Sequence, residues 1–218
     1  MMLDPLLFPS SAHYSYLFTD PDELDLTNYS KLHPLEKALV SHAVDSRKAE
    51  FGDARWCAHQ ALREMNRDTG QPILRGDRGM PLWPSSVSGS LTHTKGLRAA
   101  VVAPRLLVRS MGLDAEPAEP LPPKIVESIA FGPELDCIEE LSADFPFADR
   151  LMFCAKEATY KAWFPLTHRW LGFDEANVLL RADGTFTSVL LARPTPMHAI
   201  HGKWVCRHGY IIASTAVE

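Results

Sequence analysis

Three acidic side chains have the types and the spacing of a site for a divalent metal. Asp114 and Glu116 are separated by one residue, and Glu157 follows about forty residues later, next to Lys156. If residues 107–115 form a strand, Asp114 and Glu116 project from the same face, because side chains alternate along a strand. Carboxylate oxygens suit Mg²⁺, which is held by a few carboxylates together with phosphate oxygens and water. The three acids therefore predict a Mg²⁺ site that also binds a phosphate ester.

The same acids have a simpler explanation as solvated surface residues. Two acids at the end of a strand can both face water. Glu157 and Lys161 lie four residues apart, and such a pair on an exposed helix contributes only about 0.3 kcal/mol. Neither motif decides the matter alone, so the interpretation depends on the basic residues elsewhere in the chain.

Basic residues that suit a phosphate ligand occur upstream of the acids. Arg75 lies in a loop with Gly76 and Gly79, and glycines let a backbone approach a ligand closely. Arg47 and Arg55 lie eight residues apart on a predicted helix, about 80° apart around its axis, so they could converge on one anion. Each of these arginines could instead be a surface charge or pack through its stem. Together with three acids, they predict a polyphosphate ligand and a metal.

The hydrophobic pattern predicts the elements that must position these residues. Apolar residues recur at helical spacing over residues 34–65, with a break near Asp45 that gives two helices. Residues 1–30 predict little regular structure, and residues 70–84 contain too many glycines and prolines to form an element. Adjacent antiparallel strands are predicted at 87–93, 97–103 and 107–115. Later elements are helices starting near Pro123 and Pro133, a helix at 146–164, and strands at 176–181, 186–192, 203–207 and 210–217.

These elements predict an α+β fold of two pseudo-symmetric lobes. The proline-rich run at 117–123 is the expected boundary, which gives an N-terminal lobe of residues 1–116 and a C-terminal lobe of residues 117–218. Each lobe would hold a small, mostly antiparallel sheet packed by helices, with the active site at their junction. A chain that contains both lobes can act as a monomer.

Composition excludes several classes of protein. A formal net charge of -5 argues against nucleic acid as the main partner, since binding to a phosphate backbone usually requires a basic excess. The four cysteines include no C-x-x-C pair, so they predict reduced thiols rather than a zinc site or a disulfide framework. No run of about 18 apolar residues and no leader-like N-terminus is present, so we expect a soluble cytoplasmic protein without a membrane partner.

Four motifs, in this order, resemble those of one enzyme family. They are GMPLWP at residues 79–84, GSLTH at 89–93, GLDAE at 112–116 and FCAKEATYK at 153–161. The chain resembles the Sfp-type 4'-phosphopantetheinyl transferases, particularly the actinobacterial members related to the enterobactin synthetase component. Two positions depart from the common pattern: Thr92 stands where many relatives have Ser, and Arg75 stands where Lys is common.

The resemblance implies an activity and a set of roles. Such enzymes move the phosphopantetheine arm of coenzyme A onto a serine of an apo acyl or peptidyl carrier protein and release 3',5'-ADP. Asp114, Glu116 and Glu157 would hold Mg²⁺, or alternatively Mn²⁺, against the diphosphate, and Lys156 and Lys161 would lie near the phosphates. The remaining contacts to coenzyme A fall to a larger set: Arg47, Arg55, Arg75 and His93 around the phosphates and adenosine, and Ser90, Thr92, Met80 and Pro81 along the nucleotide.

Several features of the mechanism stay open at this point. Glu157 is the one acid without an acidic neighbour in sequence, so it could accept the serine proton directly or through a bound water, hold the metal, or do both. Phe153, Tyr160 and Trp170 could line a slot for the pantetheine arm, although core packing is an equal alternative for Phe153 and Trp170. Residues 124–141 are a candidate docking surface for the carrier.

Two other functions would use some of the same residues. A metal-dependent hydrolase of coenzyme A or of another nucleotide diphosphate needs the same acids and cations but uses water. A catalytically silent module that binds coenzyme A or a carrier would not need three mutually repelling acids. The sequence does not identify the carriers that the enzyme serves.

Overall fold

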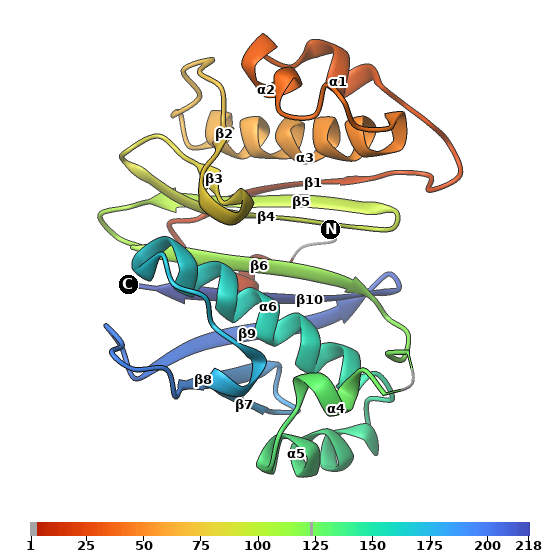
Figure 1. The fold of residues 1–218 in the computed structure, drawn as a ribbon, viewed down its shortest axis with the longest axis vertical. Coiled ribbons are helices and arrows are strands. Elements are labelled where there is room, and N and C mark those ends of the chain that lie inside the picture. Colours follow the sequence, from red (N-terminus) through yellow and green to blue (C-terminus); the bar gives the residue numbers. More distant parts are fainter. Residues whose placement is uncertain (1–3, 123) are drawn as a thin grey trace. The chain divides into compact units, whose positions relative to one another are not determined.

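The computed structural model describes residues 4–122 and 124–218, which form two compact units (Figure 1). The first unit spans Ser11–Arg109, and the second combines residues 4–10 with Ser110–Glu218. The chain therefore passes into the second unit at Ser110, several residues before the proline-rich run that marks the expected boundary. Each unit combines helices with small antiparallel sheets, which confirms the α+β fold class.

The first unit contains helices α1 (Thr27–Lys31), α2 (Pro34–Ala38) and α3 (Asp45–Glu64). The predicted break is confirmed, since α3 begins at Asp45. Pro34 occupies the first turn of α2, where its missing N–H costs nothing, and His33 Nδ1 accepts a hydrogen bond from the Leu35 backbone at 3.1 Å. Helix α3 buries one apolar stripe, which includes Phe51, Ala58 and Leu62.

The sheet of this unit has the order β1 (His13–Phe18), β5 (Leu97–Pro104), β4 (Val87–Thr94), all antiparallel. The hairpin of β4 and β5 was predicted, but β1 was not, because its partner lies far away in sequence. Helix α3 packs on one face of the sheet, where Cys57, Ala58 and Leu62 meet Val87 and Ala100. A small hairpin of β2 (Leu74–Arg75) and β3 (Pro81–Leu82) lies in the segment expected to be a loop.

The second unit is built on a sheet with the order β6 (Ser110–Pro117), β10 (Tyr210–Val217), β9 (Ala199–Arg207), β8 (Thr185–Leu190), β7 (Ala176–Leu180). The expectation that residues 107–115 pair with the β4–β5 hairpin was wrong. Strand β6 pairs instead with β10, with Asp114 opposite Ala213. Gly112 makes this position possible, because a Cβ there would lie 1.8 Å from the Ala158 carbonyl oxygen of the helix above the sheet.

That helix is α6 (Ala148–Thr167), which crosses one face of the sheet and supplies more residues to its main core cluster than any other element (Figure 1). Its buried residues Leu151, Cys154, Ala155 and Ala158 pack against Val178, Phe186, Ile211 and Ala213 from the strands. Helices α4 (Val126–Ile129) and α5 (Pro133–Ser142) precede it. Pro123 itself lies outside the described residues, but the helix expected to start near it is present as α4, which begins at Val126, and α5 begins at Pro133 as predicted.

The first described residues belong to the second unit. The short helix η1 (Pro5–Leu7) lies against β9, where Asp4 Oδ2 forms an ion pair with Arg207 Nη2 at 2.9 Å and Lys203 Nζ donates to the Leu6 carbonyl at 2.7 Å. Leu7 and Phe8 are buried there. Across residues 4–122 and 124–218, no helix is both long enough and apolar enough to cross a membrane.

Candidate active site

The predicted acids gather where α6 passes over β6. Alternation along β6 turns Asp114 and Glu116 toward α6, and each contacts a cation of that helix. Lys161 Nζ lies 2.7 Å from Asp114 Oδ1 and donates a second hydrogen bond to the Leu113 carbonyl at 3.0 Å. Arg150 Nη1 lies 3.1 Å from Glu116 Oε2. The predicted common face of Asp114 and Glu116 is therefore present.

The pKa values of this acid cluster show that its carboxylates repel one another. Burial, and then the charge of Asp114, raise the pKa of Glu116 to about 7, even though Arg150 and Lys161 act in the opposite direction. The pKa of Glu157 is raised for the same two reasons. Burial lowers the pKa of Lys161, but the charges of Asp114 and Glu157 more than offset it, so the group stays an ammonium. The cluster has an excess of carboxylate that more positive charge would relieve.

The donor chemistry of the acid cluster fits a divalent cation, although its side-chain arrangement is that of ion pairs. Within the part of the chain that the structure describes, no three His, Cys, Asp or Glu side chains are arranged as ligands of one ion. Asp114 and Glu116 are instead engaged by Lys161 and Arg150. A cation with two charges would oppose the repulsion that raises the pKa of Glu116 and Glu157. A metal would therefore compete with Lys161 and Arg150 for these oxygens.

Lys156 does not belong to this cluster, which corrects the expectation that it lies near the phosphates. Its Nζ donates to Glu134 Oε2 at 2.7 Å, to the Phe173 carbonyl at 2.5 Å and to the Ala176 carbonyl at 3.1 Å. These three acceptors use all the hydrogens of the ammonium group. The side chains of Lys156 and Glu134 are each 2% exposed. Lys156 thus joins α6 to α5 and to the segment before β7.

The first unit gathers the predicted arginines, two of them over one aromatic ring. The guanidinium carbons of Arg55 and Arg75 lie 4.7 and 4.9 Å from the ring centroid of Phe51. Burial, partly offset by Glu36, and the charges of Arg75 and Arg47 lower the pKa of Arg55 to about 10, and burial together with Arg47 lowers that of Arg75. The three cations therefore act on one another, as expected for residues that converge on one anion.

Two of these guanidinium groups have N–H donors that make no hydrogen bond to the described residues. Within residues 4–122 and 124–218, Arg55 makes one hydrogen bond, from Nε to the Ile73 carbonyl at 3.0 Å, which leaves both Nη groups for a ligand. Arg75 makes no hydrogen bond or ion pair to any described residue. Such planar forks suit the bidentate binding of phosphate. This arginine cluster, which consists of Arg55 and Arg75 over Phe51 together with Arg47, whose charge acts on both, is a candidate phosphate site.

His93 joins the edge of the arginine cluster. Its Nε2 lies 2.7 Å from Arg47 Nη1, and Glu50 Oε2 accepts a hydrogen bond from the same Arg47 nitrogen at 2.9 Å. Glu50 also lies 3.9 Å from His93 and, through Oε1, 3.8 Å from Arg98 Nη2. A single carboxylate therefore stands among three groups able to bind an anion.

The other predicted nucleotide contacts divide into two groups. In the β2–β3 hairpin, Arg75 is paired with Pro81, and the Gly76 N–H donates to the Met80 carbonyl at 2.8 Å, so these residues lie together. Ser90 and Thr92 are buried and alternate with His93 along β4, so they project from the face opposite His93. The first unit thus brings Met80 and Pro81, but not Ser90 and Thr92, to the face that carries the arginine cluster.

The predicted slot for the pantetheine arm is only partly assembled. Tyr160 lies between Trp170 and Phe164, with ring centroids 5.1 and 5.7 Å away, and Trp170 is 55% exposed. Phe153 packs instead on Phe173 at 6.0 Å, at the border of the core below α6. Tyr160 and Trp170 can therefore line a surface slot, whereas Phe153 packs with the core.

Arg150, Glu50 and Glu36 were not among the predicted residues. Arg150 lies seven residues before Glu157, and two turns of a helix bring such residues back to one face, so the stripe of Glu157 and Lys161 already contained the signal. Glu50 lies three residues after Arg47 and could have been found in the same way. Glu36 offered no such signal, because its partners come from α3 and from the segment before β2.

Comparison with known proteins identifies the family. Residues 35–103 match the 4'-phosphopantetheinyl transferase N-terminal domain, and residues 110–215 match the 4'-phosphopantetheinyl transferase superfamily. The chain is 39% identical to 4'-phosphopantetheinyl transferase Npt of Nocardia iowensis over 232 aligned positions, which cover 99% of each chain. The chain belongs to the 4'-phosphopantetheinyl transferase family. The second match begins at Ser110, where the structure also divides.

Further 4'-phosphopantetheinyl transferases and related proteins show the same similarity. The chain is 39% identical to PptT of Mycobacterium tuberculosis over 214 positions, covering 92% of this chain and 90% of PptT. Enterobactin synthase component D of Salmonella typhi is 35% identical over 138 positions, or 61% of this chain and 54% of that protein. The family transfers the phosphopantetheine group of coenzyme A to carrier proteins, and this chain is such a transferase. The resemblance read from the four motifs is confirmed.

Proposed function

We propose that the chain moves the 4'-phosphopantetheine arm of coenzyme A onto a serine of apo acyl or peptidyl carrier proteins, with Mg²⁺ held by Asp114, Glu116 and Glu157. The acid cluster carries this proposal, because burial and mutual repulsion raise the pKa of two of its carboxyl groups. When bound, Mg²⁺ would offset the charge of the diphosphate and polarise the phosphorus under attack. Arg150 and Lys161 would give up their ion pairs as it binds.

The arginine cluster binds phosphate groups of coenzyme A in this proposal. The donors are the unused Nη groups of Arg55 and the guanidinium group of Arg75, and both guanidinium groups stack on the ring of Phe51. Arg47 and His93 add donors at the edge once a phosphate displaces Glu50. We expect the nucleotide to run past Met80 and Pro81, which the β2–β3 hairpin holds beside Arg75.

The transfer itself needs one proton acceptor and a stabilised leaving group. The serine oxygen forms a bond to the phosphorus that carries the pantetheine arm, and the bond from that phosphorus to the oxygen of 3',5'-ADP breaks. We assign the serine proton to Glu157, directly or through a bound water, since this acid lies in the cluster and has no acidic neighbour in sequence. Lys161, a permanent cation four residues along the same face of α6, offsets charge on the departing phosphate.

The arm and the carrier would occupy nearby surfaces of the second unit. Tyr160 and exposed Trp170 line the slot for the pantetheine chain. For the carrier we propose the surface of α4 and α5, where Ile125, Phe131 and Leu135 are exposed. The exposed side chains of α5 include several acids, so this contact would be apolar rather than electrostatic. We expect the enzyme to act as a monomer.

Mass spectrometry of an apo acyl carrier protein after incubation with coenzyme A and Mg²⁺ tests the proposal. We expect the added mass of one phosphopantetheine group and an equal amount of 3',5'-ADP. Glu157→Gln should bind coenzyme A normally but form no holo carrier, and near-normal turnover of this variant would remove its role as base. Coenzyme A cleaved without carrier, with no modified carrier formed in its presence, would show a hydrolase and refute the transferase proposal.

A further inference from the structure

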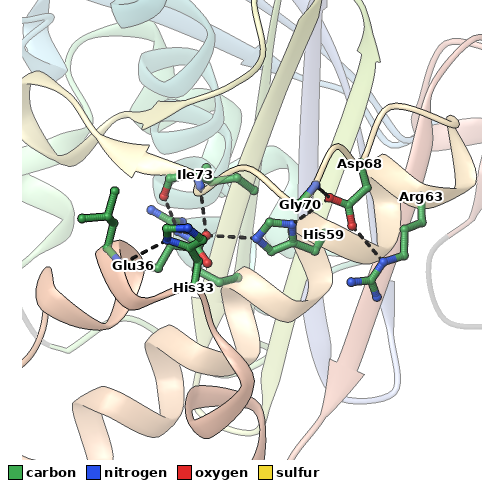
Figure 2. Close-up of polar contacts among 9 residues, drawn as sticks. His33, Glu36, His59, Arg63, Asp68, Gly70 and Ile73 are labelled. Atoms are coloured by element: carbon green, nitrogen blue, oxygen red, sulfur yellow. Dashed lines mark hydrogen bonds and ion pairs between the residues drawn. The ribbon is translucent and has the colours of Figure 1, made fainter.

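A fully buried carboxylate lies beneath the arginine cluster. Glu36 in α2 is 0% exposed, and its Oε1 accepts hydrogen bonds from the Ile73 backbone N–H at 2.9 Å and from His59 Nε2 at 3.0 Å (Figure 2). Arg55 Nε lies 4.0 Å from the same oxygen. Burying an acid is costly unless several groups compensate it, so this position requires an explanation.

Glu36 and Arg55 hold the backbone of one residue, Ile73, on both sides. Glu36 accepts from the N–H of Ile73, while Arg55 Nε donates to the carbonyl of the same residue at 3.0 Å. The Ile73 side chain is itself buried in the core of the first unit. Strand β2 starts at the next residue, so this double contact fixes the point from which the strand and Arg75 extend.

The contacts of Arg75 make it dependent on that fixed point. Its side chain touches the ring of Phe51 but makes no hydrogen bond or ion pair with any residue in the ranges 4–122 and 124–218. Arg47 and Arg55 repel it. With little else to restrain the guanidinium, the backbone anchor at Ile73 and the short pairing of β2 with β3 determine where it lies.

Glu36 is also the acid that balances the buried part of the arginine cluster. It is the one carboxylate that acts on Arg55 among the described residues, and it opposes the effects of Arg75 and Arg47. On its far side, His59 Nδ1 lies 3.4 Å from Asp68 Oδ1, and Asp68 Oδ2 accepts from Arg63 Nε at 2.8 Å (Figure 2). This chain of contacts orients His59, while the Ile73 N–H and Arg55 hold the Glu36 carboxylate from the other side.

We propose that Glu36 is a positioning residue for coenzyme A binding, which acts by anchoring Ile73 so that Arg75 is held ready over Phe51. The inference rests on the proposed function, in which the arginine cluster binds a phosphate of coenzyme A. Glu36 touches no substrate and takes no part in the chemical step. Its loss therefore raises the KM for coenzyme A without changing kcat.

Glu36→Gln tests this in the full-length chain, with the rate of holo-carrier formation measured over a range of coenzyme A concentrations. The neutral amide oxygen of Gln is a weaker acceptor for the Ile73 N–H than the carboxylate, and it no longer carries the charge that attracts His59 and Arg55, so the anchor at Ile73 is loosened. We expect the KM for coenzyme A to rise about tenfold, equivalent to about 1.4 kcal/mol, with kcat within about twofold of the original. An unchanged KM in the folded variant would overturn the inference.

Asp68→Asn is the matched control for general loss of stability. It cuts the outer end of the same chain of contacts, but it leaves Glu36, Ile73 and Arg55 in place. We expect a lower Tm with a KM within about twofold of the original. A KM that rises equally in both variants at equal loss of Tm would show a purely structural role. If Glu36→Gln does not fold, Glu36→Asp replaces it, because it keeps the charge but withdraws the oxygen from Ile73.

A double-mutant cycle with Arg75→Met separates the inference from the function on which it rests. Arg75→Met alone should raise the KM for coenzyme A about tenfold or more, and adding Glu36→Gln should then raise it by no more than about threefold. A full tenfold effect of Glu36→Gln in the Arg75→Met background would show that Glu36 does not act through Arg75. An unchanged KM in Arg75→Met alone would refute the proposed phosphate site and this inference with it.

Discussion

Lys156→Met should unfold the second unit more easily without changing its chemistry. Lys156 and Glu134 form a buried ion pair at 2.7 Å, and loss of one member leaves the other charge buried alone. Such a change typically costs about 3–5 kcal/mol. Glu134 keeps two backbone donors, the Phe131 N–H at 2.9 Å and the Val178 N–H at 2.7 Å, which places the cost near the lower limit.

The expected change in melting temperature follows from that cost. At about 2–4 °C per kcal/mol for a chain of this size, a loss of about 3 kcal/mol lowers the Tm by about 6–12 °C. Differential scanning calorimetry measures the shift, and holo-carrier formation well below the Tm measures activity. We expect kcat and KM for coenzyme A within about twofold of the original, because Lys156 spends its three donors on Glu134 and two carbonyls.

Lys161→Met provides the matched comparison on the same helix. Its side chain is 28% exposed and its partner Asp114 belongs to the acid cluster, so we expect a smaller loss of Tm and a fall in kcat of about a hundredfold.

A double-mutant cycle of Lys156→Met with Glu134→Gln measures the buried pair directly, and we expect a coupling energy of about 1–3 kcal/mol. A Lys156→Met protein with an unchanged Tm and activity lowered a hundredfold would refute the reasoning and show that Lys156 acts near the phosphates of the substrate.

Three further changes test other parts of the structure. Arg150→Met removes the competitor for Glu116 and should tighten Mg²⁺ binding about threefold to tenfold in a titration with the metal, whereas weaker binding would show that Arg150 helps to build the site. Burial lowers the pKa of His59, but its two carboxylate partners raise it above the unfolded value. Its contribution to the unfolding free energy is therefore full below about pH 6.5 and is lost as the pH rises through the raised pKa. His59→Gln should abolish this dependence of the unfolding free energy on pH. Phe8→Ala should lower the unfolding free energy by about 3 kcal/mol, while Leu6→Ala, at an exposed position, should leave it within about 0.5 kcal/mol.

Elements with local signals could be predicted from the sequence. The strands at 87–94 and 97–104 flank a Lys95-Gly96 turn, and Gly96 adopts the positive φ of 78° that such turns favour. The break before α3 and the start of α5 at Pro133 also follow from local residues. The alternation that put Asp114 and Glu116 on one face was enough to bring them together without knowledge of the partner strand.

The partners of strands could not be predicted in this way. Alternation states which side chains share a face, but the edge that a strand joins depends on non-local contacts. Strand β6 follows β5 closely, yet it pairs with β10 almost one hundred residues later, where Gly112 allows the close approach of α6. Strand β1 was missed for the same reason, since β5 is its only hydrogen-bonded neighbour among the described strands.

Lys156 shows that a sequence motif alone does not decide which of its side chains reach the site. Lys156 and Glu157 are adjacent in sequence, but consecutive residues of a helix point about 100° apart, so adjacency alone does not place both on the same ligand. Glu157 and Lys161 lie on one face of α6, and the residue that shares this face one heptad earlier is Arg150, not Lys156. The structure agrees, since Arg150 and Lys161 engage the acids of β6 while Lys156 is buried against Glu134. An ammonium group next to a predicted catalytic acid in sequence can thus belong to the core, as the helical phase of its neighbours and its buried partner show.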